Sequence, residues 1–261
     1  SQLIQHLAAL EQSGALSDEC GILVIPCANQ FSMNVGRRFW AADNTDINRM
    51  FPGYDQGETT QRIAARLFGA LQGYRWGVHL TSFYLPGDHL PHVRMMDTGY
   101  QQVEEAAAFG LPYILVRTPQ AYDTTTLNYN WQIWNTQAFS LYSTSTECAD
   151  DDAARLTVEA ILRFLAVKGL LKRPYFPAAG QPRILRENAL HTVLSHAGGL
   201  MLNRRAPGDR VEAGELLGEI IDPCTCRSLE QLRADCRGRV FFCHRAQLID
   251  GHEVAFRLLP E

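Results

Sequence analysis

The residues with the clearest chemical meaning lie between Arg37 and Gly53. This segment holds arginines, carboxylates and the pair Asn48-Arg49, has almost no apolar periodicity, and closes in Phe-Pro-Gly. Polar side chains on a loop contribute little to a core, whereas an arginine can hold a carboxylate through two parallel charge-assisted hydrogen bonds. The segment therefore predicts a loop that binds an anionic substrate.

The stretch from Asp46 to Gly53 resembles the Asp-x-Asn-Arg-x-Phe-Pro-Gly motif of the succinylglutamate desuccinylase/aspartoacylase family, which belongs to the zinc-carboxypeptidase-like amidohydrolases. The resemblance is specific over 43–53, moderate over 77–96, and looser over most of the remaining chain. It implies a zinc-dependent hydrolase, with one Zn²⁺ ion, that cleaves an amide bond of an N-acyl amino acid or a related substrate bearing a carboxylate.

In that family the Asn-Arg pair binds the substrate carboxylate and steadies the scissile carbonyl, so the resemblance implies these roles for Asn48 and Arg49. Arg38 resembles a further substrate-binding arginine ahead of the motif, although the spacing here is longer. The alternative for Arg49 is an ion pair with Asp43 or Asp46 that only orders the loop.

The resemblance also implies that His79 is a metal ligand. Zinc suits the reaction because it polarises a carbonyl and lowers the pKa of its bound water. The alternative for a histidine at a strand end is a side chain satisfied within the core. The family commonly has Asp two residues before this histidine, where the chain has Gly77.

The family's other two metal ligands form a His-x-x-Glu pair, which this sequence lacks. By its order in the family, the pair should precede the opening helix, so we expect it upstream of Ser1. The alternative is a protein that has lost two of its three ligands, and one histidine alone cannot hold zinc.

The position that matches the family's general-base glutamate holds Tyr142. A tyrosine can donate a hydrogen bond to a tetrahedral intermediate but is a poor base near neutral pH. Glu147 is a second candidate for the base, with a solvated surface acid as its alternative. Arg117 follows a predicted strand, at the end where α/β proteins form sites, and is either a further carboxylate contact or a surface ion pair.

Two other interpretations stay open. The chain could be a non-catalytic anion-binding relative that has lost the metal site, which Tyr142 and Gly77 favour. It could also be an enzyme of altered chemistry in which Tyr142 replaces the missing carboxylate.

His89, His92 and Arg94 follow closely in a stretch rich in Pro, Gly and His, from residue 84 to 96. Two histidines beside an acidic residue suggest a second metal ion, but their spacing on an irregular loop is weak support. We expect these three side chains to line the mouth of the cleft.

Composition narrows the class of protein. A net charge of −4 gives no electrostatic footprint for nucleic acid. Seven scattered cysteines do not form a disulfide pattern, which favours a cytoplasmic protein, and the C-terminal ones lack the C-x2-C spacing of structural zinc. No apolar run approaches the roughly 20 residues that span a bilayer. A small anionic substrate is the expected partner, and self-association into a homo-oligomer stays open.

The elements that must position these residues alternate between helix and strand. Apolar spacing predicts helices at the start of the chain, after residue 59, and over 98–110, 127–134 and 153–167, with strands over 21–26, 76–80, 111–116 and 138–142. This alternation predicts an α/β fold with a mostly parallel or mixed sheet flanked by helices. We assign residues 1–174 to this catalytic domain.

A proline-containing linker follows, and then the pattern changes. Short alternating segments separated by Gly, Pro and Asp predict a small all-β C-terminal module over 183–261. The module resembles the β-rich C-terminal domain of the same family, where shielding the cleft or forming an oligomer contact would be its role. Lys172 is the last lysine in the chain, which excludes a lysine-attached swinging arm.

Overall fold

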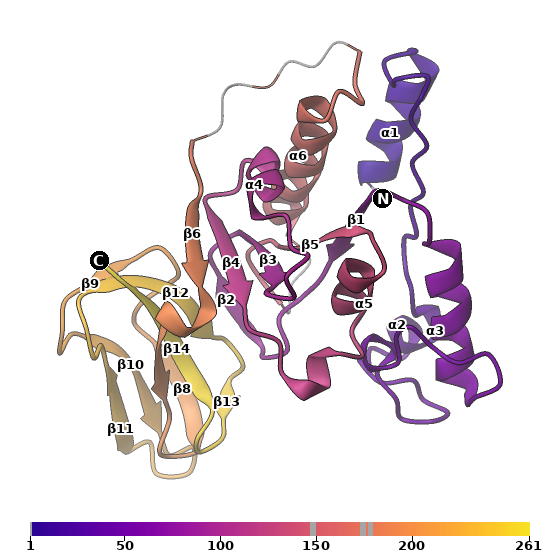
Figure 1. The fold of residues 1–261 in the computed structure, drawn as a ribbon. Helices are drawn as coiled ribbons and strands as arrows, with labels where there is room; N and C mark the ends of the chain where they lie inside the picture. Colours follow the sequence, from indigo (N-terminus) through magenta and orange to yellow (C-terminus); the bar gives the residue numbers. More distant parts are fainter. Residues whose placement is uncertain (1, 147–149, 173–175, 177–179) are drawn as a thin grey trace.

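A five-stranded mixed sheet forms the centre of the N-terminal part of the protein (Figure 1). The computed structural model describes residues 2–146, 150–172, 176 and 180–261. The strand order is β1 (Trp76–Leu80), β5 (Gln137–Tyr142), β3 (His92–Met96), β4 (Tyr113–Arg117) and β6 (Arg183–Arg186). Of the four pairs between these strands, β3–β5 is antiparallel and the others are parallel. The predicted α/β fold with a mixed sheet is confirmed.

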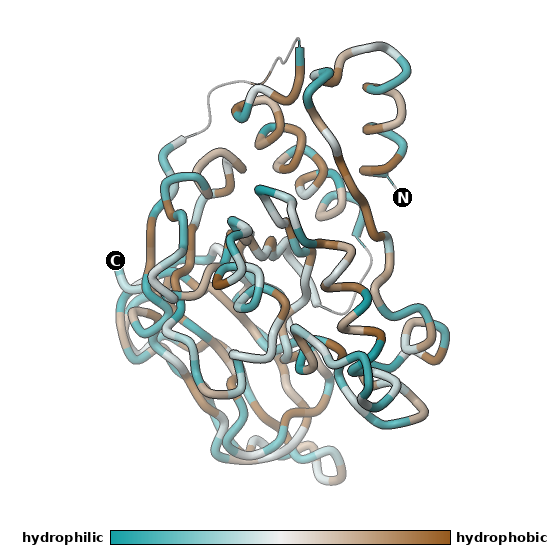
Figure 2. The backbone as a smooth tube through the Cα atoms, turned by 45° about the vertical axis from the view of Figure 1, so that its right-hand side comes forward, coloured by the Kyte–Doolittle hydropathy of each residue, from teal (hydrophilic) through white to brown (hydrophobic). Residues whose placement is uncertain are grey.

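Helices cover both faces of this sheet. They are α1 (Gln2–Gln12), α2 (Gln30–Asn34), α3 (Thr59–Ala70), α4 (Val103–Ala106), α5 (Leu127–Ile133) and α6 (Asp151–Val167), with 3-10 turns η1 (Ile47–Arg49), η2 (Ala107–Phe109) and η3 (Ala121–Asp123). Successive strand residues point to opposite faces. Accordingly, Phe139 of β5 packs with α1, η2 and α6, whereas its neighbour Ala138 packs with α3 and α5. Figure 2 shows hydrophobic and hydrophilic residues interleaved along these helices, as expected for elements with one buried side.

Local sequence signals set the helix ends. The carboxylate of Asp150 accepts a hydrogen bond from the backbone N–H of Asp152 at 2.9 Å, which caps α6 at its first turn. Gly110 ends the α4–η2 segment with φ +71°, the left-handed conformation that glycine adopts readily. Both ends agree with the predicted helices, but the predicted start at residue 98 was wrong, because α4 begins at Val103.

Two local predictions were wrong. Residues 21–26 form no strand, and Ile22 and Leu23 are 38% and 43% exposed, because no described strand pairs with this segment. The stretch from 84 to 96 is not one long loop but contains β2 (Gly87–His89) and the central strand β3. Strand β3 could not be recognised in the sequence because it contains the polar residues His92 and Arg94. Their side chains contact residues distant in sequence, Tyr142 and Glu187.

The C-terminal part consists of antiparallel β sheets, as predicted. One sheet has the order β11 (Ser228–Arg233), β10 (Leu216–Ile221), β8 (Gly199–Asn203) and β13 (Leu248–Ile249). The other has the order β2, β12 (Gly238–His244), β14 (Val254–Pro260) and β7 (His191–Leu194), with β9 (Arg210–Val211) beside β12. Their facing residues form a core with Leu217, Ile220, Val240 and Phe256 at its centre.

The two parts exchange strands. β2 lies within the N-terminal part of the sequence but pairs with β12 of the C-terminal sheets, and β6 follows the linker but pairs with β4 of the central sheet. The 3-10 turn η4 (Glu187–Ala189) joins β6 to β7 and so lies between the two parts. The residue boundaries assigned from the sequence stay a prediction.

Within the described ranges, no helix combines the length and the apolar character needed to cross a lipid bilayer.

Candidate active site

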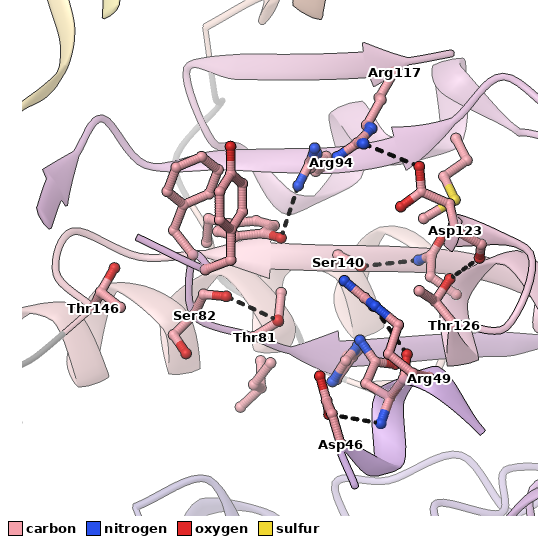
Figure 3. Close-up of a pocket in the computed structure, with 18 of the residues that line it drawn as sticks. Asp46, Arg49, Thr81, Ser82, Arg94, Arg117, Asp123, Thr126, Ser140 and Thr146 are labelled. Atoms are coloured by element: carbon pink, nitrogen blue, oxygen red, sulfur yellow. Dashed lines mark hydrogen bonds and ion pairs between the residues drawn. The ribbon is translucent and has the colours of Figure 1, made fainter. Parts of the chain in front are cut away.

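A cavity of about 560 Å³ lies on the α3–α5 face of the central sheet, and Figure 3 shows the side chains around it. Strand pairing builds its floor. In the register of the sheet, His79 of β1 lies opposite Ser140 of β5, which lies opposite Arg94 of β3. Residues directly opposite one another in a sheet point to the same face. Three residues far apart in the sequence therefore form one row beneath the cavity.

The row continues along each strand at intervals of two residues. Tyr142 lies two residues beyond Ser140 in β5. Arg117 of β4 lies opposite Met96 of β3, which is two residues beyond Arg94. The side chains of Tyr142 and Arg117 therefore point to the same face as the row and line the cavity. Gly77 lies two residues before His79. A Cβ at Gly77 would lie 2.7 Å from the ring of Trp131, so the absence of an acidic residue here has a packing cause.

The His79 imidazole is neutral at neutral pH. Burial lowers its pKa to about 4, although the negative charge of Asp46 opposes this shift. The neutral form carries a lone pair that can bind a metal ion. His79 lines the cavity together with Asn48 and Arg49, rather than pointing into the core on the other side of the sheet.

The loop before α3 is held by its own carboxylates. Asp46 accepts hydrogen bonds from the backbone N–H of Asn48 at 2.9 Å and from Nε and Nη2 of Arg38 at 2.9 and 2.7 Å. Asp43 accepts from the backbone N–H and the hydroxyl of Thr60, at 3.1 and 2.5 Å, and so ties the loop to α3.

Asn48 has one end fixed. Its side-chain oxygen accepts a hydrogen bond from the backbone N–H of Leu127 at 3.0 Å, which satisfies a free donor in the first turn of α5. The side-chain amide nitrogen has no hydrogen-bond partner among the described residues, and Asn48 lines the cavity. The amide nitrogen is therefore available to donate to a ligand.

Arg49 is the arginine of the cavity wall that has no carboxylate partner within the described residues. Its Nη1 donates to its neighbour's backbone oxygen at 3.0 Å, and its guanidinium carbon lies 6.0 Å from the centre of the Tyr122 ring. The alternative of an ion pair with Asp43 or Asp46 is wrong, because Thr60 and Arg38 occupy these two acids. The Arg49 guanidinium is thus free to bind a ligand carboxylate.

The opposite wall contains a buried ion-pair cluster. Arg94 lies 3.0 Å from Glu187, Arg117 3.4 Å and Arg257 3.0 Å, so three guanidinium groups share one carboxylate. Burial alone would raise the pKa of Glu187, but these three arginines lower it below its usual value, so the carboxylate stays ionised. Arg117 also lies 3.0 Å from Asp123. The predicted Arg117 is thereby an ion-paired residue of the wall.

Tyr142 is held rigidly at the edge of this cluster. Its hydroxyl accepts a hydrogen bond from Nη1 of Arg94 at 3.2 Å, and its ring stacks on His92 with 4.7 Å between centroids and a 5° tilt. Burial alone would lower the pKa of Arg94, but the negative charge of Glu187 and the hydrogen bonds that Arg94 donates to Glu187 and Tyr142 raise it. Glu147, the other predicted base, lies outside the described residues.

His89 and His92 do not line the mouth of the cleft, so this expectation was wrong. They are 4% and 3% exposed, lie behind Tyr142, and border a second, small pocket with Phe241 and Phe242. Burial lowers the pKa of His92 to about 3. Their site is an apolar contact between the central sheet and the C-terminal sheets.

Sequence reasoning missed Glu187, Arg257, Ser140 and Asp123. Glu187 and Arg257 lie beyond the linker, in the part predicted as a separate module, and they meet the cavity wall only because β6 and η4 return to the central sheet. A signal for these acids was available in the sequence, which places several arginines in the predicted site. Buried arginines need carboxylate partners.

The described residues fit one zinc ligand but not a complete zinc site. His79 offers a neutral imidazole to the cavity. In the part of the chain that is described, His, Cys and acidic side chains form a group of three only at His191, Asp235 and Cys236, within 4.8 Å, and none of these lines the cavity. Catalytic zinc sites usually have three protein ligands.

The chain is similar to proteins of known family and to solved structures. The profile of the succinylglutamate desuccinylase/aspartoacylase catalytic domain matches residues 2–167. An N-alpha-acetyl-L-2,4-diaminobutyric acid deacetylase of Halomonas elongata is 26% identical over 214 residues, which are 77% of this chain and 60% of that protein. The chain thus spans about three fifths of the length of this curated relative.

Solved structures share the fold. A succinylglutamate desuccinylase from Silicibacter sp. superposes with a TM-score of 0.82 at 18% identity, over 98% of this chain and 79% of that one. The product-bound ectoine utilization protein EutE (DoeB) from Ruegeria pomeroyi superposes with a TM-score of 0.80 at 18% identity, over 99% and 80%. At these identities the likeness shows the fold alone.

Proposed function

The chain belongs to the succinylglutamate desuccinylase/aspartoacylase family, and on that premise we propose that it is a hydrolase that removes the acyl group from an N-acyl amino acid or a related carboxylate-bearing amide. One observation carries the proposal. A guanidinium with no described carboxylate partner, that of Arg49, and a neutral imidazole, that of His79, line the same cavity. One end of a ligand can therefore be anchored while its amide lies beside His79.

Arg49 and Asn48 bind the substrate in this proposal. The Arg49 guanidinium takes the substrate carboxylate in a charge-assisted pair, and its packing near Tyr122 limits its directions. The free amide nitrogen of Asn48 donates to the scissile carbonyl, because its oxygen is already committed to Leu127. Arg38 contributes at the rim, where its side chain is 46% exposed and paired with Asp46.

We further propose that His79 holds a zinc ion as one of its ligands. When bound, zinc would polarise the scissile carbonyl and lower the pKa of a bound water. The support from this chain is the depressed pKa of His79, about 4, which keeps the ring in the form that binds a metal at neutral pH.

Tyr142 acts as a hydrogen-bond donor rather than as a base. Because its hydroxyl oxygen accepts from Arg94, its own proton is free to point into the cavity. A donor at this place stabilises the oxygen on which negative charge develops during amide cleavage. Glu147 stays a candidate for the base on sequence grounds.

Release of the free amine tests the hydrolase. The purified protein is incubated with a panel of N-acetyl and N-succinyl amino acids, and metal content is measured alongside. We expect amine release and bound zinc, both lost in His79→Ala and both kept in His6→Ala, a matched change on the exposed side of α1. Hydrolysis at the wild-type rate in His79→Ala would contradict the proposal.

Tyr142→Phe tests the donor role. Loss of one hydrogen bond to the developing charge should lower kcat about 10- to 100-fold with little change in KM. An unchanged kcat would remove Tyr142 from the reaction.

A non-catalytic anion-binding protein is the second candidate. It is favoured by Tyr142 at the position of the family's base and by the single metal ligand that the described residues offer to the cavity. Binding of acyl-amino acids that depends on Arg49, without amine release and without metal, would establish this alternative.

A further inference from the structure

The arginines that line the cavity have unequal partners. Arg38 is paired with Asp46, Arg94 with Glu187, and Arg117 with both Asp123 and Glu187, whereas Arg49 has no carboxylate partner in the described ranges. In Figure 3, Arg94 and Arg117 lie on one side of the pocket and Arg49 on the other. Two anion-binding places are therefore built into one cavity, but one of them already contains a protein carboxylate.

Glu187 is the carboxylate that pairs with Arg94 and Arg117 from behind the cavity wall. It does not line the cavity itself, and its side chain is 18% exposed. Both of its oxygens accept hydrogen bonds from Nη2 of Arg94, at 3.0 and 3.2 Å, and Nη1 of Arg257 donates to it at 3.0 Å. Through these contacts the carboxylate occupies Nη2 of Arg94, a donor of the cavity wall.

We propose that Glu187 determines the charge of the substrate. Together with Asp123, which also pairs with Arg117, it gives Arg94 and Arg117 carboxylate partners, so that Arg49 is the cavity arginine without one in the described ranges and the cavity selects compounds with one carboxylate and an uncharged acyl group. Removal of the Glu187 charge turns the same wall into a second carboxylate subsite. The inference rests on the proposed function in one respect, which is that the cavity is the place where substrate binds.

Two small ligands of equal chain length test this without turnover. Butyrate and succinate both have four carbons but carry one and two carboxylates. Isothermal titration calorimetry at pH 7.5 should show that the wild-type protein binds succinate no more than about threefold more tightly than butyrate, because a single charged contact is available. Succinate binding more than about tenfold tighter would overturn the inference.

Glu187→Gln supplies the second arm, since it keeps the shape and removes the charge. The ratio of succinate to butyrate affinity should rise about tenfold, because Arg94 gains a free guanidinium edge. Glu215→Gln is the matched control, because Glu215 also pairs with an arginine, Arg205, but lies just before β10, outside the cavity. It should leave the ratio unchanged.

A folded Glu187→Gln protein with the wild-type ratio would overturn the inference. If this variant does not fold, the double variant Glu187→Gln/Arg257→Gln restores the charge balance behind the wall while still releasing Arg94, and the same rise is expected. The wild-type measurement decides in either case. Butyrate and succinate binding as expected, without hydrolysis of any acyl-amino acid, would leave this inference standing and defeat only the proposed function.

Discussion

Arg49 and Arg94 line the same cavity but are embedded in opposite ways. Arg49 stands on a loop, touches a backbone oxygen and an aromatic ring, and has no carboxylate partner in the described part of the chain. Arg94 stands on the central strand β3, has a side chain that is only 12% exposed, and is bound by Glu187 and Tyr142. The comparison shows that residue type does not decide an arginine's role. The role depends on whether the fold brings a carboxylate to it.

The comparison makes a first prediction about stability. Arg94→Met should lower the free energy of unfolding by about 3–5 kcal/mol, because it leaves part of a buried carboxylate charge uncompensated. Urea denaturation measures it, with Arg66→Ala on the exposed side of α3 as control. A loss below about 1 kcal/mol would mean that the cluster is solvated and that the two arginines do not differ as described.

The contact behind Arg94 predicts a dependence on pH. The pKa of His92 is about 3 in the folded protein, below the unfolded value near 6.5, so the unfolded chain takes up a proton first as the pH falls. His92 thus costs no stability above pH 6.5 and destabilises the protein increasingly between pH 6.5 and 3.

Between pH 7 and 4.5, His92→Phe should lose about 2–3 kcal/mol less stability than the wild type. Unfolding free energies at the two pH values provide the measurement. Equal losses in both proteins would show that His92 takes up its proton at the same pH in the folded and the unfolded protein.

Arg49 should show the reverse pattern to Arg94. Arg49→Ala should weaken binding of an acyl-amino acid by about 1.5–3 kcal/mol, the value of a hydrogen bond to a charged group, while leaving the unfolding midpoint unchanged. Calorimetric titration and urea denaturation of the same sample measure both quantities. Unaltered affinity would discard Arg49 as the carboxylate anchor.

Arg38 should show the smallest effect. The Arg38 side chain is 46% exposed, and Asp46, at 10%, keeps its hydrogen bond from the backbone N–H of Asn48, so Arg38→Ala should change stability by about 1 kcal/mol or less. Ligand affinity should fall less than in Arg49→Ala, since Arg38 already has a partner. A larger loss of affinity than in Arg49→Ala would reverse the order of the two arginines.

Much of the fold could be predicted from local patterns. Apolar spacing and caps identified α5, α6 and β1, because such elements bury one continuous face and end at residues such as Asp150 and Gly110. Strand β3 could not be predicted, since His92 and Arg94 interrupt its apolar character. The prediction of a strand over residues 21–26 was wrong for the opposite reason. Their apolar run predicts a buried strand, yet no described strand lies beside it.

Only those residues of the site that belong to a recognisable sequence motif could be predicted. The pair Asn48-Arg49 and His79 were marked by the sequence, and the structure brings all three to one cavity. Glu187 and Arg257 carried no local pattern, and they come from beyond the linker. Their part in the cavity wall follows from strand exchange between the two parts of the chain.

The sequence by itself determined the family, the alternation of helices and strands, and the loop that holds Asn48 and Arg49. The tertiary structure decided which arginines of the cavity have a carboxylate partner among the described residues. For Arg94 the decision depends on an ion pair with Glu187, 93 positions away, which in turn pairs with Arg257, 70 positions further on. Coulomb attraction acts through space, so no spacing along the chain can reveal it.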